Sequence, residues 1–346
     1  MNKTRNSLLT VLSIIGLFIF LWYASIHFNK YNIRIMNDVA IFMMLAVSYN
    51  LINGVTGQFS LEPNGFTAIG AYVSSLLTLT VAQKHAMFII VPMIHPLDTW
   101  HLPFLAALIV GGLVTSMVAF VLAFPVFRVR GDYLAIVTLG FGIVIRVISN
   151  NAMSVTNGAL GLKGISESTN LWWSWGWAVF SIIIIMRLIN SGYGRAMKAV
   201  RDDEDAAIAM GINSLKIKMI AFITSAFFEG VAGGLLAHLI TTISPTLFTF
   251  LMTFNLLIII VVGGLGSMTG SIIATVIVIW GSELLRVVDQ PMHLFSITIP
   301  GVPGMRMILF AVLLIATMIF AREGIMGQRE FSWDNFLNMF RLRKQR

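Results

Sequence analysis

Residues 191–218, SGYGRAMKAVRDDEDAAIAMGINSLKIK, are the one long, strongly charged stretch in the interior of a chain that is otherwise rich in apolar residues. Seven of the eleven positions from Arg195 to Asp205 are charged, although charged residues make up only 11% of the 346-residue chain. Charged side chains are costly in the hydrocarbon core of a bilayer, so this stretch is expected to face water. It therefore marks the part of the chain that meets an aqueous partner.

The composition of the chain indicates a membrane protein. Hydrophobic residues make up 57% of it, and its mean hydropathy is +0.87. Because a membrane-spanning helix needs about 20 mostly apolar residues, the sequence predicts an all-α polytopic membrane protein with about ten (8–10) transmembrane helices. The candidate spans are 7–26, 34–54, 63–82, 103–127, 132–149, 171–190, 217–240, 250–265, 268–288 and 304–321.

Three further properties narrow the class. The chain has no cysteine, which excludes disulfides, thiolate metal ligands and a cysteine nucleophile. Its net charge of +8 fits basic residues on the cytoplasmic face of a membrane better than it fits binding of nucleic acid. The first span follows Lys3 and Arg5 as a signal peptide would, but no small-x-small cleavage site follows Trp22, so we predict a retained helix.

The distribution of Lys and Arg sets the predicted orientation. If the loop 191–216 is cytoplasmic, alternation of the spans places the N-terminus, the turn at 128–131 and the C-terminal tail on the same side. That side then carries fifteen Lys and Arg residues, against about seven on the other. We therefore predict that both termini are cytoplasmic. The tail, 327–346, combines aromatic and basic residues and is expected to form an amphipathic helix on an anionic membrane face.

The charged stretch is predicted to form a two-faced helix over residues 195–210, at about 100° of rotation per residue. One arc holds Arg195, Lys198, Arg201, Asp202 and Asp205, and the opposite arc holds Ala196, Ala199, Val200, Ala206, Ala207 and Met210, with Asp203 among them. Gly211 follows, where a helix end favours a residue that tolerates positive φ. This pattern fits a helix that docks into a soluble partner, or a solvated helix supported by pairs such as Arg201–Asp205.

The Asp205-Ala206-Ala207 sequence with Gly211 resembles the EAA-type loop through which permeases of ABC importers engage their ATPase subunits. Asp replaces the usual Glu, and the later I-x-L-P part is not evident. From about residue 34 to 326 the chain resembles the M-type permease of branched-chain amino-acid ABC importers, a high-affinity importer family with two homologous permeases. The segments that carry the resemblance are FPVFRVRGDYLAIVTLGFG (124–142), GRAMKAVRDDEDAAIAMGIN (194–213), VVGGLGSMTGSIIAT (261–275) and SELLRVV (282–288).

The resemblance implies a non-catalytic transport subunit that moves leucine, isoleucine or valine across a bacterial inner membrane. Its implied partners are a homologous second permease, two cytoplasmic ATPases and an extracytoplasmic substrate-binding protein. This chain would bind no cofactor, and ATP-Mg would be used by the ATPases. Residues 1–326 would form the transmembrane permease domain, with a cytoplasmic coupling loop at 191–216, and 327–346 the basic amphipathic cytoplasmic tail. The implied coupling residues are Arg201, Asp202, Asp203, Asp205, Ala206, Ala207 and Gly211.

The most unusual apolar segment is NLINGVTGQFSLEPNGFTAIGAY, residues 50–72. Gly54 and Gly57 weaken a continuous helix, and Pro63 suits the first turn of a new one. Irregular backbone at membrane depth is tolerated where protein or a water-filled cavity covers it, and transporters place polar paths at such breaks. The candidate residues of a translocation path are therefore Asn53, Gln58, Ser60, Glu62 and Asn64, together with Asn255 in a later span.

Glu62 departs from the family pattern, in which small or histidine-containing residues follow the preceding Ser-Leu. Three roles remain open for it: contact with a substrate ammonium, a gate or cytoplasmic-mouth residue, or a structural cap; if the segment lies near the cytoplasmic surface, Glu62 would simply be solvated. Glu229 and His238 lie on opposed sides of one predicted helix, so they cannot form one local site, and a core role is expected for each.

Two other functions compete with the importer of branched-chain amino acids. A permease for urea, short amides or other amino acids would share the same architecture. An ion-driven secondary transporter would need several acidic residues deep in its spans, and only Glu62, Glu229 and Glu283 are near candidates. An intramembrane enzyme is disfavoured, because the sequence has neither an H-E-x-x-H nor a G-x-S-x-G motif and no phosphate-binding loop.

Overall fold

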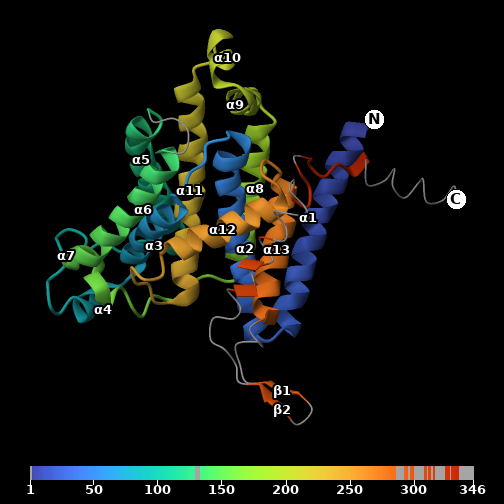
Figure 1. The fold of residues 1–346 in the computed structure, drawn as a ribbon. Helices are drawn as coiled ribbons and strands as arrows, with labels where there is room; N and C mark the ends of the chain where they lie inside the picture. Colours follow the sequence, from blue (N-terminus) through green and yellow to red (C-terminus); the bar gives the residue numbers. More distant parts are fainter. Residues whose placement is uncertain are drawn as a thin grey trace.

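The computed structural model describes residues 2–128, 133–285, 292–294 and 297–299, with residues 308–309, 311–312, 315, 324–327 and 329–334. Long apolar helices form a bundle with a small hydrophilic projection at one end (Figure 1). The helices are α1 (Asn2–His27), α2 (Lys30–Asn50), α3 (Pro63–Thr78), α4 (Val81–Met87), α5 (Phe104–Val126), α6 (Tyr133–Asn151), α7 (Met153–Thr156), α8 (Leu171–Ile189), α9 (Gly192–Asp202), α10 (Glu204–Ala209), α11 (Ser214–Ile240), α12 (Phe250–Gly263) and α13 (Met268–Leu284). A π-helical turn, Leu51–Val55, continues α2, Gly158–Leu160 forms a 3-10 turn, and β1 (Met292–Leu294) pairs antiparallel with β2 (Ile297–Ile299).

The predicted all-α polytopic class is confirmed. Each of the nine predicted spans from 7–26 to 268–288 coincides with a helix of the structure. Within the described residues, six helices are long and apolar enough to cross a membrane, α3 and α4 form a pair bent by 117°, and α12 and α13 are shorter apolar helices. The tenth predicted span, 304–321, and most of the tail, 327–346, lie outside the described residues.

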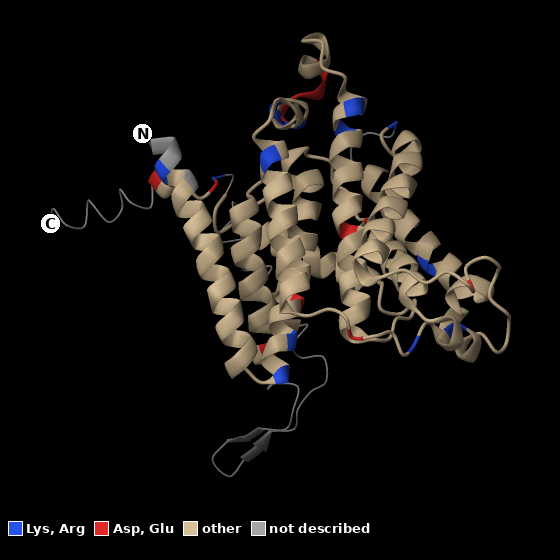
Figure 2. Ribbon diagram, turned by 180° about the vertical axis from the view of Figure 1, so that it is seen from behind, with Lys and Arg blue, Asp and Glu red and all other residues tan. Residues whose placement is uncertain are grey.

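The helices on the outside of the bundle expose apolar side chains, as lipid-facing helices do. Met117 and Val121 on α5 are 71% and 64% exposed, and Ile136 on α6 is 64% exposed. An apolar surface of this extent marks contact with lipid or with another subunit. Figure 2 shows that charged residues gather mainly at the two ends of the bundle and leave most of its middle uncharged.

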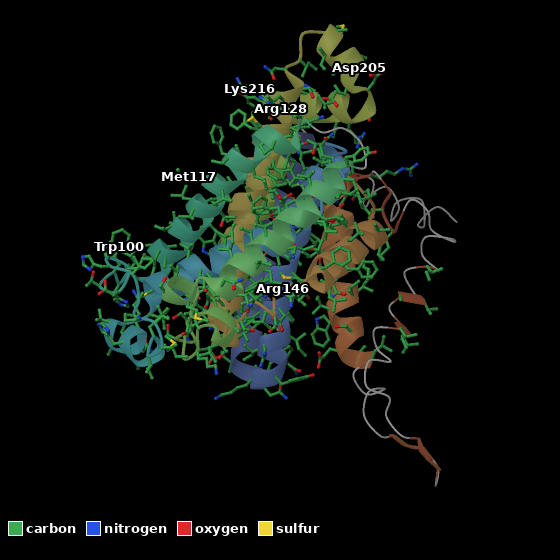
Figure 3. All side chains as sticks on the ribbon, turned by 60° about the vertical axis from the view of Figure 1, so that its left-hand side comes forward. Trp100, Met117, Arg128, Arg146, Asp205 and Lys216 are labelled. Atoms are coloured by element: carbon green, nitrogen blue, oxygen red, sulfur yellow. The ribbon has the colours of Figure 1, made fainter. Side chains whose placement is uncertain are left out.

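The two ends of the bundle differ in what they carry. The N-terminus of α1, the end of α5 and the helices α9 and α10 lie at one end, whereas α4, β1 and β2 lie toward the other (Figure 1). Figure 3 shows Arg128, Asp205 and Lys216 together at the first end, away from Trp100. The predicted alternation is therefore confirmed for these segments. That this end is cytoplasmic stays a prediction.

The centre of the bundle is formed by α2, α3 and α11. A Cβ atom added to Gly70 on α3 would lie 2.0 Å from the carbonyl oxygen of Gly230 on α11, so the two backbones are in direct contact. One turn further along both helices, Gly234 lies against Ser74, which shows that the helices run parallel. The first turn of α3 is therefore held beside the N-terminal half of α11, in the interior of the bundle.

Candidate translocation site and coupling surface

The helix break predicted in residues 50–72 is present. The α-helix α2 ends at Asn50, the π-helical turn follows, and α3 begins at Pro63 after a non-helical stretch. The Thr56 hydroxyl donates to the carbonyl oxygens of Leu51 (3.1 Å) and Ile52 (2.6 Å), which occupies backbone acceptors at the end of the turn. Gly57 has φ of +67°, a conformation that few other residues adopt without strain. Gly54 and Gly57, the two glycines that predicted the break, therefore both lie within it.

Buried polar groups hold the break in one conformation. The Tyr49 hydroxyl donates to the carbonyl oxygen of Ser60 at 2.7 Å, and the Ser60 amide donates to Asn53 Oδ1 at 2.9 Å. The Leu61 amide donates to the Thr138 hydroxyl on α6 at 2.8 Å. Because these backbone groups are paired inside the protein, the non-helical segment is stable at this depth.

Four of the predicted path residues are buried at the break, and two are not. Asn53, Ser60, Glu62 and Asn64 are at most 8% exposed. Gln58 is half-buried and donates to the Thr56 carbonyl oxygen at 3.2 Å. Asn255 is exposed on α12 and lines a separate, mainly apolar pocket of about 290 Å³, so the structure does not bring it to the break.

The structure excludes two interpretations of Glu62. A solvated carboxylate is excluded, because Glu62 is 0% exposed. A side-chain cap is also excluded: Glu62 occupies the N-cap position of α3, but its carboxylate makes no capping hydrogen bond. Instead its backbone carbonyl accepts from the Gly65 amide at 2.8 Å. The Glu62 side chain is therefore available for another role.

The sequence analysis gave Glu229 a core role and did not place it at the candidate site. It is 0% exposed on α11, the helix that packs directly against α3. Ser225, one turn earlier, lies 2.9 Å from Glu229 Oε1 and 2.7 Å from the Ser48 carbonyl oxygen, so the carboxyl faces α2. An ionisable residue inside a span is itself a functional signal, but only the fold places it near Glu62.

His238 has a separate environment, as predicted. Its Nδ1 lies 2.7 Å from the Gly234 carbonyl oxygen, and its Nε2 lies 2.7 Å from the Thr78 hydroxyl. The ring also packs edge-on against Phe104 at a centroid distance of 4.7 Å. Both ring nitrogens thus have partners, and the residue has the core role expected for it.

The prediction of one helix over 195–210 is wrong. The segment forms two helices, α9 and α10, separated at Asp203, whose backbone is extended (φ −158°, ψ 107°). Asp203 caps α10, because its Oδ1 accepts from the Ala206 amide at 2.9 Å. Asp203 therefore does not lie within a helix face of small residues, although the predicted single helix had placed it there. Gly211 has φ of +83°, as predicted for the residue that ends the segment.

The two short helices present different surfaces. On α9, Met197 and Val200 are buried against the bundle, and on α10, Ala207 is buried as well. Exposed residues at the projection include Asp202, Asp205, Ala206, Ile208 and Met210, the last 83% exposed. The predicted small-residue arc is therefore divided between the two helices. The apolar residues of α9 pack against the bundle, whereas α10 presents apolar residues outward.

Arg201 does not belong to that outward surface, although the sequence analysis grouped it with the charged arc. Its Nη1 donates to the Gly54 carbonyl oxygen at 3.3 Å, and its Nη2 lies 2.9 Å from the Asp202 carboxylate. A Cβ on Gly57 would lie 2.5 Å from Arg201 Cγ, and one on Gly266 would lie 3.4 Å from Nη1. The side chain of Arg201 thus occupies the space between the break and the turn that precedes α13.

That turn, Gly264–Ser267, is tied to the break by Asn50. The Gly266 amide donates to Asn50 Oδ1 at 2.9 Å, and Asn50 Nδ2 donates to the Ser267 carbonyl oxygen at 3.0 Å. From the C-terminal part of the chain, Glu330 accepts from the amides of Met268 (2.7 Å) and Thr269 (3.1 Å) and caps α13. The glycine-rich turn, the break and the charged projection therefore form one connected unit.

A second link joins α10 to α11. Lys218 Nζ lies 2.7 Å from Glu204 Oε2, and the Ser214 hydroxyl donates to the same carboxylate. The Lys218 side chain is 5% exposed and that of Glu204 is 27% exposed, so the pair is largely shielded from water. Movement of α10 would therefore displace the start of α11, the helix that carries Glu229.

A helix bundle with a polar break inside it and a charged projection outside it has the architecture of a membrane transport subunit. A model of the permease component of branched-chain amino acid transport systems matches residues 31–318, and the chain belongs to that family. No solved structure matches the chain.

Individual relatives agree with this family. The chain is 32% identical over 292 residues to the high-affinity branched-chain amino acid transport system permease protein LivM of Salmonella typhimurium, covering 75% of this chain and 64% of that protein. Identity to Escherichia coli LivM is also 32%, over 71% of this chain and 61% of that protein. The LivH permease protein of Salmonella typhimurium is 23% identical over 68% of this chain and 79% of LivH. The matches thus span less than two thirds of the length of these two LivM proteins.

Proposed function

We propose that this chain is the non-catalytic permease subunit of an ATP-driven ABC importer that moves branched-chain amino acids into the cytoplasm. Membership of the permease family supports the transport class, and the names of the LivM and LivH relatives support the substrate class and a paired second permease. The observation that carries the proposal is the contact of Arg201 with Gly54, because it joins a water-facing helix to a helix break inside the bundle.

The ATPase partners dock on the exposed face of the projection. Ala206, Ile208 and Met210 offer small and apolar contact area, and Asp202 and Asp205 flank it with negative charge. Beside α10 lies a hollow of about 530 Å³, lined by residues that include Phe127, Arg128, Glu204, Ile208, Leu215 and Lys218. This end of the bundle and both chain termini are cytoplasmic in the proposal, in the bacterial inner membrane. The extracytoplasmic binding protein meets the opposite end, which includes the loop at 150–170.

Two contacts transmit the motion of the ATPases. When ATP-Mg closes the ATPase pair, α9 and α10 shift together. Arg201 carries the shift of α9 to the break and to the Gly264–Ser267 turn, and the Glu204–Lys218 pair carries the shift of α10 to α11. Both routes end on helices that border the buried carboxyl groups. The nucleotide state of the ATPases then determines the side of the membrane to which the interior of the bundle is open.

Uptake measurements test the proposal. The chain and its companion genes are expressed in a strain that lacks its own branched-chain importers, and uptake of radiolabelled leucine, isoleucine, valine and urea is measured. We expect saturable uptake of the three amino acids that disappears when the ATPase is inactivated. Uptake of urea alone would replace the substrate assignment. Uptake that follows an ion gradient without the ATPase would overturn the proposed class.

A further inference from the structure

Two carboxyl groups are fully buried inside the bundle without a basic partner. Glu62 and Glu229 are each 0% exposed, and Tyr49 lies within electrostatic range of both. Neither oxygen of Glu62 has a hydrogen-bond partner, and Glu229 Oε2 has none. Among the described residues, no Lys, Arg or His pairs with either carboxyl. A buried charge without a partner is strongly destabilising, so such groups normally have a partner or a ligand.

Two polar atoms close to Glu62 in the sequence are also buried without a hydrogen-bond partner. Asn64 Oδ1, two residues after Glu62, is buried and has no partner, and the Ser60 hydroxyl, two residues before it, is buried and unpaired. Asn64 Nδ2 is turned away toward the Phe248 carbonyl oxygen, at 3.4 Å. The two carboxyls thus present three unpaired acceptor oxygens. Unpaired acceptors that carry negative charge are the complement of a group with several N–H donors and a positive charge.

The position of Glu229 is fixed rather than incidental. The single proton of the Ser225 hydroxyl is shared between two acceptors, the Ser48 carbonyl oxygen and Glu229 Oε1. This arrangement anchors Glu229 toward α2, where Tyr49 binds the carbonyl oxygen of Ser60. The Glu229 carboxyl is therefore anchored toward α2, next to the break that carries Glu62, and three of the four oxygens of the two carboxyls have no hydrogen-bond partner.

We propose that Glu62 and Glu229 together bind the ammonium group of the transported amino acid as it passes the helix break. An ammonium supplies one positive charge and three donors, which match the three unpaired oxygens of the two carboxyls. This inference rests on the proposed function, because it takes an amino acid as the substrate. It adds a defined site to the transport path, one that includes a residue on α11 and one at the start of α3.

Binding to the permease without its binding protein tests this site. The complex of this chain with its companion permease and ATPases is purified, and saturable binding of radiolabelled leucine is measured. We expect Glu62→Gln and Glu229→Gln each to weaken leucine binding about tenfold or more, the range expected for a charge-assisted hydrogen bond. Glu283→Gln serves as the matched control. Glu283 is a half-buried carboxyl near the end of α13 that hydrogen-bonds with Tyr31, and we expect it to leave leucine binding unchanged.

A competition assay with leucine on the wild-type complex tests the site without depending on the folding of a variant. 3-Methylbutylamine, which keeps the ammonium and the branched chain of leucine, should displace leucine, whereas 4-methylpentanoate, which lacks the ammonium, should not. Two outcomes would overturn the inference and mean that the two carboxyls bind only a proton. One is equal displacement of leucine by both compounds. The other is leucine binding that is absent, or that neither Gln substitution changes. If intact cells take up leucine while these results fail, the site is wrong and the proposed function stands. If cells take up no leucine, the proposed function fails first.

Discussion

Replacing Arg201 with methionine should reduce the coupling between ATP hydrolysis and transport while leaving the complex assembled. Methionine retains an unbranched apolar stem that can pack against Gly57, but it cannot donate to the Gly54 carbonyl oxygen. The lost hydrogen bond comes from a charged group, is long at 3.3 Å, and belongs to a side chain that is 21% exposed. We therefore take its contribution at the low end of the range, about 1 kcal/mol, which corresponds to roughly a fivefold change in the coupled equilibrium.

The assay is the ratio of leucine molecules transported to ATP molecules hydrolysed in proteoliposomes that contain the whole importer. We expect the Arg201→Met ratio to fall about fivefold, whereas Arg201→Ala, which also removes the stem packing, should lower it further. Arg187→Met is the matched control, because Arg187 is exposed at the end of α8 outside the charged projection. An Arg201→Met complex that assembles normally and transports with the wild-type ratio would refute this role for the contact.

Three further predictions concern the projection and the helix packing. Asp203→Asn should retain both the cap of α10 and transport activity, whereas Asp203→Ala should lower the local stability of α10, measured by hydrogen exchange, by about 1 kcal/mol. Asp203→Lys should abolish uptake while the complex still assembles. Unimpaired uptake by the Lys variant would contradict the assignment of Asp203 to coupling. Gly70→Ala should lower the yield and thermal stability of the folded chain, because its Cβ would lie 2.0 Å from a backbone oxygen, whereas Gly140→Ala, with nothing within 4 Å, should not. Lys218→Met should destabilise the protein, because it removes the Nζ that lies 2.7 Å from Glu204 Oε2, and adding Glu204→Gln should restore part of the loss. Equal stabilities of the single and double variants would argue against the ion pair.

The apolar spans could be predicted because hydropathy over about 20 residues is a strong local signal. Gly54, Gly57 and Pro63 likewise indicated the break correctly, since their backbone preferences act over a few residues. In both cases the information lies within a short window of sequence and does not depend on distant contacts.

The interior of the charged projection could not be predicted from helical periodicity alone. A helical projection assumes that the helix continues, so it cannot register that Asp203 leaves the helix to cap the next one. The sequence did contain a start signal, an Asp followed by acidic residues Glu204 and Asp205 in the first turn. Reading that signal would have divided the segment in two.

The contacts that define the site depend on tertiary structure. Glu229 is more than 160 residues from Glu62 in the sequence, and only the parallel packing of α3 on α11 brings the two carboxyls near each other. Arg201 reaches Gly54 over a separation of 147 residues. Asn255 was assigned to the path as a polar residue in a span, and its position on an outer surface of α12 could not be known without the fold.

The cap of α13 by Glu330 has a consequence for biosynthesis. Glu330 lies 62 residues after Met268, the first residue of α13, and the Ser267 hydroxyl donates to the carbonyl oxygen of Arg329. During translation, α13 and the turn before it are made long before the residues that complete them. A nascent chain that stops short of residue 330 therefore keeps the Ser267 cap of α13 but lacks the hydrogen bonds from Met268 and Thr269 to Glu330. Completion of this connected unit thus waits until residue 330 has been synthesised.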